Sequence, residues 1–156
     1  MKEIFCDVLI AGGGNAALSA AITAAEKGHS VIVADRAPYH MRGGNTRHTR
    51  NLRAMHNNPT NILSDSYQED EYYDDLIRVT EGNTNEKLAH LTIQKSAELT
   101  DWLFERGIKF QPALGGTLSL GRTNAFFLGG GRAMLNALYR TAIRLKVKCL
   151  CNTEVL

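Results

Sequence analysis

Long hydrophobic runs and basic runs are both missing from this chain of 156 residues. No apolar stretch approaches the roughly 20 residues of a membrane-spanning helix, and the first residues lack the apolar core of a signal peptide. The net charge is only +2, so we expect no nucleic-acid partner. Only three cysteines are present, an odd number that does not suggest a disulfide framework. The composition therefore predicts a reduced, cytoplasmic protein.

Two of the cysteines, Cys149 and Cys151, are separated by one residue, as two side chains on the same face of a strand would be. A Cys-x-Cys pair can bind metal, but no second cluster of ligands accompanies it, so we expect no metal site. The remaining composition is ordinary for a globular protein, with 44% hydrophobic and 22% charged residues, and the length suits about one domain.

The N-terminal segment has the order of elements that a dinucleotide-binding βαβ unit requires. An apolar run predicts a strand over 4–11, which ends in a glycine-rich turn. The turn opens directly into an alanine-rich helix predicted over 15–27. Gly28 would end that helix, because glycine accepts the left-handed conformation common after helix C-termini. A second strand, predicted over 30–35, ends in an acid.

Each residue type in this unit has a physical role in holding a dinucleotide. Gly12 permits the turn out of the strand, Gly14 lets the backbone approach a pyrophosphate, and Ala17 lets the helix lie close to the strand. The helix N-terminus offers unpaired N–H groups and partial positive charge to the phosphates. Asp35 can accept hydrogen bonds from both hydroxyls of a ribose. We therefore expect cofactor contacts from Gly12, Gly13, Gly14, Asn15, Ala16, Ala17, Asp35 and Arg36.

The rest of the chain predicts further helices and strands after one long loop. Residues 36–60 have no clean periodicity and contain five arginines, which favours a functional loop. An acidic, aromatic segment predicts a helix over 65–78. Asn83 with Glu86 forms the capping-box signature of the next helix, which Gly107 would end. The remaining predictions are a short strand over 108–110, a hairpin or extended segment over 115–128, a helix over 132–145 and a strand over 147–151.

A second glycine cluster, Gly43-Gly44-Asn45-Thr46-Arg47-His48, distinguishes among dinucleotide-binding proteins. It resembles the Gly-Gly-Asn-Ser/Thr segment of the fumarate reductase and succinate dehydrogenase flavoprotein family, which runs along the FAD pyrophosphate towards the flavin. The run Gly129-Gly130-Gly131-Arg132 and the segment Asn152-Thr153-Glu154-Val155 are similar to later elements of that family. The resemblance implies an α/β fold, a Rossmann-like FAD/NAD(P)-binding domain with a parallel sheet and ββα packing.

The resemblance also implies FAD as the cofactor. It adds contacts from Gly43, Gly44, Asn45, Thr46, Arg47, His48 and Val155. In the succinate dehydrogenases a histidine near this segment is joined covalently to FAD, but for His48 we favour a noncovalent place in the wall of the flavin pocket. An NAD-binding domain remains an alternative if the likeness over 43–48 is a coincidence.

Within the family, residues 43–53 most resemble the members that oxidise tricarballylate to aconitate. This implies a small carboxylate as substrate, dehydrogenated to its alkene. The alternatives are another substrate on the same domain, as in ketosteroid dehydrogenases, fumarate reductases or aspartate oxidases, and a non-catalytic FAD-binding module. Arg47, Arg50 and Arg53 are candidates to bind carboxylates. Pairing with the acidic helix is an equally favoured role for these arginines.

The resemblance further implies a division of the parent protein. Residues 1–156 would form the N-terminal part of the FAD-binding domain, with the substrate-capping domain and the catalytic residues beyond Leu156. We therefore expect these residues alone to be inactive as an enzyme. An electron-acceptor protein at a membrane is a further partner that the resemblance implies.

Overall fold

The computed structural model describes residues 3–113 and 120–156, which form two compact units. Unit 1 contains Met1–Thr49 and Gly129–Leu156, and unit 2 contains Arg50–Leu128. Within the described residues, no helix is both long enough and apolar enough to cross a membrane.

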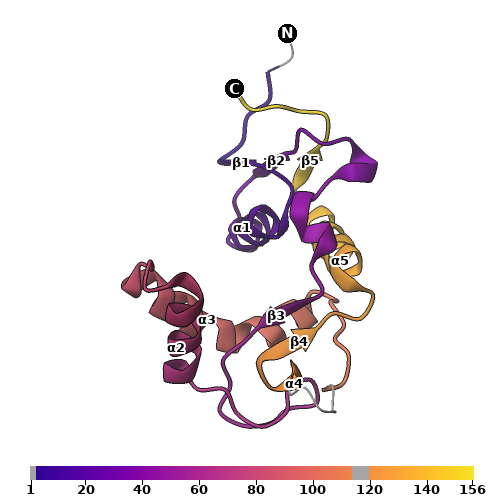
Figure 1. Cartoon of the computed structure of the whole chain (residues 1–156). Helices are drawn as coiled ribbons and strands as arrows, with labels where there is room; N and C mark the ends of the chain where they lie inside the picture. The colour runs from indigo at the N-terminus through magenta and orange to yellow at the C-terminus, as the bar shows by residue number, and fades with distance from the viewer. Residues whose placement is uncertain (1–2, 114–119) are drawn as a thin grey trace. The chain divides into compact units, whose positions relative to one another are not determined.

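Unit 1 is built on a parallel sheet of three strands in the order β1-β2-β5 (Figure 1). The strands are β1 (Val8–Ala11), β2 (Val31–Ala34) and β5 (Lys148–Leu150). All four residues of β2 are buried, which explains why this strand is an unbroken apolar run. Its register is fixed by pairing with both neighbours, Val8 with Val31 on one side and Ile32 with Lys148 on the other.

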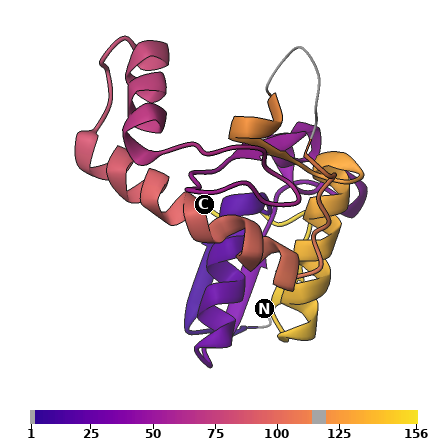
Figure 2. The ribbon, with the colours of Figure 1, turned by 90° about the horizontal axis from the view of Figure 1, so that it is seen from below.

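Two helices complete unit 1, α1 (Asn15–Glu26) and α5 (Gly130–Arg144), and they pack against one another. In Figure 2 the α1 ribbon runs alongside the strands of the sheet. Leu18 and Ile22 of α1 and Leu138 of α5 are fully buried. Because α1 connects the parallel strands β1 and β2, the predicted βαβ unit is confirmed. Gly28 has a φ of +88° after the end of α1, as the sequence predicted.

Short helical turns occupy much of the segment predicted as a long loop. Two 3₁₀ helices, η1 (Tyr39–Met41) and η2 (Gly44–His48), lie in unit 1. Strand β3 (Asn51–Arg53) then begins unit 2. The long, ordered loop predicted over 36–60 therefore contains three short regular elements that the sequence did not indicate, because each is too short to show a periodicity.

Unit 2 combines a two-stranded antiparallel sheet with helices. Strand β3 pairs with β4 (Asn124–Phe126), and α2 (Glu69–Thr80) packs on α3 (Glu86–Glu105). A single turn, α4 (Leu120–Thr123), leads into β4. Ala54, Leu63 and Ala125 form a buried apolar cluster beside this sheet.

Several predicted boundaries in unit 2 need correction. The helix predicted from 65 begins at Glu69, because the Tyr67 backbone instead exchanges two hydrogen bonds with that of His56. The N-cap of α3 is Asn85, whose side chain accepts the Leu88 N–H at 3.0 Å, and not Asn83. The Asn83 amide instead donates to Thr80 in the turn after α2.

The strands predicted near the end of unit 2 also differ. Only Phe110 of the strand predicted over 108–110 pairs, through an isolated bridge to Phe127. The prediction of a hairpin or extended segment over 115–128 is met in part: Asn124–Phe126 is extended as β4, but it pairs with the distant β3 and not within a hairpin, and Leu120–Thr123 is a helical turn. Residues 114–119 of that prediction lie outside the described residues.

In unit 1 the remaining differences are small shifts of boundaries. Strand β1 begins at Val8 and not at residue 4, and α5 begins at Gly130, two residues before the predicted start. The glycines at the start of α5 lower its helix propensity, so sequence reasoning placed them outside the helix. The strand predicted over 147–151 is present as β5.

Candidate functional site

The glycine turn after β1 allows other groups to approach the backbone closely. Gly12 has a φ of +98°, and its N–H donates to the Ala34 carbonyl at 2.7 Å. A Cβ on Gly13 would overlap the Asp35 carboxylate and the Tyr139 hydroxyl. Gly12 therefore provides a left-handed turn, whereas Gly13 provides space for two polar side chains.

Thr46 of η2 lies at the N-terminus of α1. Its hydroxyl accepts the Asn15 N–H at 3.0 Å and would lie 3.2 Å from a Cβ placed on Gly14. The N-cap residue of α1 is Gly14, which has no side chain to cap the helix, and the first turn contains no acidic residue. The structure thus brings together the two predicted segments, 12–17 and 43–48, at a helix end whose dipole favours an anion.

Asp35 closes the loop that leads to η2. Its Oδ1 accepts the Ala37 N–H at 3.0 Å, and its Oδ2 accepts the Gly43 N–H at 3.1 Å. A carboxylate has about four lone-pair directions, so these two bonds leave acceptor capacity for a ribose. The Thr153 N–H donates to the Asp35 carbonyl at 3.0 Å, which brings the 152–155 segment beside the end of β2. Val155 follows with 47% of its surface exposed.

Tyr139 of α5 belongs to this site and was not predicted. Its side chain is 4% exposed, and its hydroxyl donates to the Gly13 carbonyl at 3.0 Å. Burial, with the Asp35 charge as a smaller cause, raises the pKa of Tyr139, so the hydroxyl stays protonated and remains a donor. A contact between residues so far apart in the chain leaves no local signal in sequence.

The start of α5 packs tightly against η2. The Gly131 N–H donates to the Thr49 carbonyl at 2.8 Å, and a Cβ on Gly131 would overlap the carbonyls of Thr46 and Thr49. A Cβ on Gly43 would overlap Leu135. Two of the segments on which the family resemblance rests, 43–48 and 129–132, therefore lie in contact with each other, directly and through the adjoining Thr49.

The remaining predicted contacts are near the surface of unit 1. Arg36 pairs with Glu154 at 3.5 Å, with 80% and 58% of the two side chains exposed. Asn45, Ala16, His48 and Gly44 are exposed, and Ala17 is partly buried. The Arg47 side chain lines a cavity between η1, η2 and α5.

The loop arginines separate into two groups. The Arg53 guanidinium lies 3.3 Å from the Asp75 carboxylate of α2, so the predicted pairing with the acidic helix is confirmed for this residue. Arg47 instead approaches the sulfur of Met41 at 3.2 Å. Arg50 is exposed in unit 2. Arg53 is therefore paired within the protein by a carboxylate, whereas the contact of Arg47 is to a sulfur atom.

The cysteines do not form a metal site in the described part of the chain. All three are free, and no group of three or more His, Cys, Asp or Glu side chains is placed to hold a metal ion there. Burial raises the pKa of Cys149, with the neighbouring Cys151 as a smaller cause, which keeps its thiol protonated.

Comparison with known proteins gives a match over almost the whole chain. A sequence profile described as "FAD binding domain" matches residues 7–156. The chain is 25% identical over 153 residues to an NADH:fumarate oxidoreductase from Klebsiella pneumoniae (strain 342). That match covers 96% of this chain but only 16% of the relative.

Solved structures share the fold. A 3-ketosteroid-Δ4-(5α)-dehydrogenase from Rhodococcus jostii RHA1 matches with a TM-score of 0.77 and 18% identity, covering 94% of this chain and 38% of that one. A flavocytochrome c3 fumarate reductase matches with a TM-score of 0.72 and 22% identity, covering 94% of this chain and 26% of that one. The parallel α/β architecture is therefore common to all three chains.

Proposed function

The chain belongs to the family of FAD-binding domains, with FAD as its cofactor, and we propose that it is the cofactor-binding part of a flavin-dependent oxidoreductase. When bound, the flavin supplies the hydride chemistry, and the protein holds and orients it. The observation that carries this proposal is the meeting of the glycine turn, the α1 N-terminus and Thr46. These groups come from both segments that a dinucleotide pyrophosphate would need.

The fit of the residues to FAD has a simple basis. The Thr46 hydroxyl, which accepts the Asn15 N–H, could donate its own proton to the pyrophosphate at the α1 N-terminus, where no carboxylate of the first turn opposes it. The Asp35 carboxylate would accept from the adenosine ribose. Backbone groups near Val155 would border the adenosine, because residues 152 and 153 are hydrogen-bonded beside Asp35.

For the substrate we propose a small carboxylate that is dehydrogenated to an alkene, with tricarballylate as the first compound to test. The likeness over residues 43–53 supports this choice. A different substrate on the same domain, including a ketosteroid, is the competing proposal, and a non-catalytic FAD-binding module is another. The membrane electron acceptor, from the family resemblance, and the cytoplasmic location, from the composition, are further predictions.

The FAD site is tested by replacing Gly14 with valine and titrating FAD by fluorescence. A valine there would meet the Thr46 hydroxyl and occupy the space where the backbone approaches the pyrophosphate, so binding should be lost. Ala20→Val is a matched control, because it adds the same side chain at an exposed position of α1 away from its N-terminus. Equal FAD affinity in both variants and the wild type, at matched circular dichroism, would refute this placement. A denatured supernatant that contains NAD and no flavin would refute the cofactor itself.

The substrate is tested separately on the parent protein with FAD bound. Reduction of a dye acceptor should depend on tricarballylate and produce aconitate. Turnover of a ketosteroid and none of tricarballylate would replace the carboxylate proposal, while FAD binding stayed intact.

A further inference from the structure

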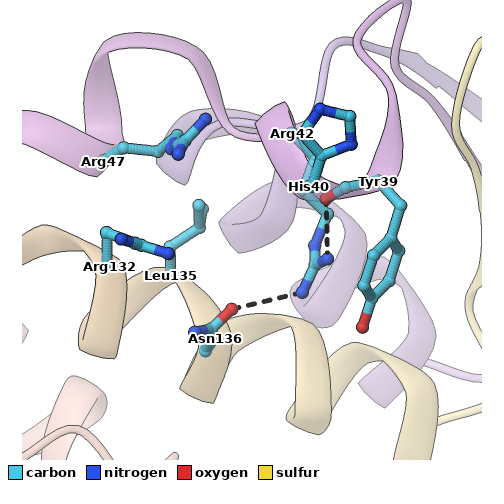
Figure 3. A pocket seen from close by; sticks show the side chains of 7 residues that line it. All are labelled: Tyr39, His40, Arg42, Arg47, Arg132, Leu135 and Asn136. Carbon is cyan, nitrogen blue, oxygen red and sulfur yellow. Dashed lines mark hydrogen bonds between the residues drawn. The ribbon is translucent and has the colours of Figure 1, made fainter.

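Unit 1 has a cavity of about 290 Å³ lined by cationic and polar side chains from η1, η2 and α5 (Figure 3). Arg42 lies on one side of it, with Arg47 and Arg132 on the other. The remaining lining residues are Tyr39, His40, Leu135 and Asn136. No aspartate or glutamate is among them.

Arg42 is held in a fixed orientation. Its guanidinium lies over the ring of Tyr39 at 3.8 Å and that of Tyr139 at 4.4 Å. Its Nη1 donates to the Tyr39 carbonyl at 2.9 Å, and its Nη2 donates to the Asn136 side-chain oxygen at 3.2 Å. Its Nε is buried and has no hydrogen-bond partner among the residues that the structure describes. Stacking and hydrogen bonding therefore fix this group in place, and none of its contacts within residues 3–113 and 120–156 is to a carboxylate.

The other two arginines also lack a carboxylate. Arg47 reaches only the Met41 sulfur, at 3.2 Å, and Arg132 makes no ion pair within the described residues. Arg132 and Asn136 are four residues apart on α5, so they share one face of that helix. Three positive groups thus surround one cavity, which favours a ligand that carries negative charge.

This cavity is separate from the α1 N-terminus. Thr46 and Arg47 are neighbours on η2, yet the Thr46 hydroxyl bonds the Asn15 amide while the Arg47 side chain lines the cavity. The buried Leu135 packs against Gly43 beneath the same turn of chain. Side chains on one side of η2 therefore serve the predicted pyrophosphate site, and those on the other side serve the cavity.

We propose that this cavity binds a small polyanion, a molecule with at least two carboxylate or phosphate groups, independently of FAD. Two anionic groups fit the arrangement, because Arg42 stands apart from Arg47 and Arg132 in Figure 3. The planar fork of arginine suits both kinds of oxyanion. The proposal does not depend on the proposed oxidoreductase function, since it can be measured with no flavin and no substrate present.

The test is calorimetric titration of the protein at constant ionic strength with citrate, with inorganic pyrophosphate and with acetate. We expect one equivalent of citrate or pyrophosphate to bind and acetate not to saturate. The tighter of the two polyanions identifies a carboxylate or a phosphate source. Arg132→Gln should weaken that binding about tenfold or more, as expected for loss of a charge-assisted contact. Arg140→Gln is the matched control, because Arg140 is exposed on the same helix but does not line the cavity.

Three results would overturn the proposal. The first is the absence of saturable binding by both polyanions. The second is equal weakening by Arg132→Gln and Arg140→Gln, which would indicate only the general positive charge of α5. The third is stoichiometric displacement of the polyanion by FAD, which would make the cavity part of the cofactor site.

Discussion

The arginines of the two units differ in what neutralises them. In unit 2, Arg53 and Arg78 meet Asp75, and Arg122 meets Glu71. In unit 1, Arg42, Arg47 and Arg132 line a cavity without a carboxylate, and the ion pair between Arg36 and Glu154 is largely exposed.

The carboxylates of unit 1 are used differently. Asp35 accepts the backbone amides of Ala37 and Gly43, and Asp7 accepts the amide and hydroxyl of Ser30. Asp7 and Asp35 therefore bond backbone groups of loops, whereas Arg42, Arg47 and Arg132 line a cavity that has no carboxylate. Unit 2 has a cavity of about 350 Å³ too, but its lining arginine, Arg53, is already paired with Asp75. A basic residue beside a cavity indicates a ligand only when its charge has no partner in the protein.

The largest expected effect is on the ion-pair network of unit 2. Asp75 is 19% exposed at its side chain and binds Arg53, Arg78 and the hydroxyl of the buried Tyr67. Asp75→Ala should lower the free energy of unfolding by about 2–3 kcal/mol, because Arg53 and Arg78 lose a counter-ion and the Tyr67 hydroxyl loses its hydrogen-bond acceptor. Urea denaturation measures the change. Asp74→Ala, at the adjacent exposed position, is the control, and an equal loss in both variants would mean that the network is not structural.

The second effect is on the glycine turn of unit 1. Gly13→Ala should cost about 1–3 kcal/mol of stability, because its Cβ must displace Asp35 or Tyr139. Gly14→Ala should cost less, since its nearest neighbour would be the Thr46 hydroxyl at 3.2 Å. Thermal unfolding of the two variants without FAD separates these cases. A less stable Gly14→Ala than Gly13→Ala would contradict the packing described for Tyr139.

The sequence predicted well those regions whose contacts join residues close together in the chain. Local patterns identified the βαβ unit, because strand, turn, helix and acid follow one another in sequence. The structure places the Gly43–His48 segment beside the glycine turn, whereas the sequence associated the two segments only through a family resemblance. Its physical basis, the Asn15–Thr46 hydrogen bond, joins residues distant in the chain.

Contacts between distant residues account for what was missed. Tyr139 looks like any aromatic residue of an amphipathic helix, and nothing near it in sequence indicates its bond to Gly13. The same applies to the stacking of Arg42 on Tyr139, on which the proposed anion site depends. The capping-box signature pointed to Asn83, whereas in the structure the Asn83 backbone N–H bonds the Thr80 carbonyl and the Asn85 side chain caps α3.

A smaller effect compares the two kinds of arginine directly. Arg53→Gln should lower the free energy of unfolding by about 1 kcal/mol, since it removes a partly exposed ion pair with Asp75. Arg132→Gln should change it by less than about 0.5 kcal/mol, because no carboxylate in the described residues depends on it. Both are measured by urea denaturation in a buffer free of polyanions. A larger loss for Arg132→Gln would mean that this residue has a structural role and would weaken the contrast between the units.

The smallest expected effect concerns two carboxylates whose pKa is lowered for different reasons. Hydrogen bonds from the Ser30 hydroxyl and amide, at 2.6 and 2.7 Å, hold the pKa of Asp7 below its usual value. The guanidinium of Arg122 does the same for Glu71 in unit 2. A lowered pKa means that the charged form is favoured by folding. Each acid therefore contributes stability above its unfolded pKa, about 4, which is lost as the pH falls through the lower folded value.

This prediction is measured as the melting temperature of the wild type minus that of Asp7→Asn, and likewise for Glu71→Gln, at pH 6 and near pH 3. Both differences should be positive at pH 6 and shrink at the lower pH. High salt should reduce the Glu71 difference, because it screens an ion pair whose side chains are 44% and 27% exposed. The Asp7 difference should persist in salt, since it depends on short hydrogen bonds to neutral groups. Equal salt sensitivity of the two would show that the acids of unit 1 also act mainly through charge, contrary to the distinction between the units.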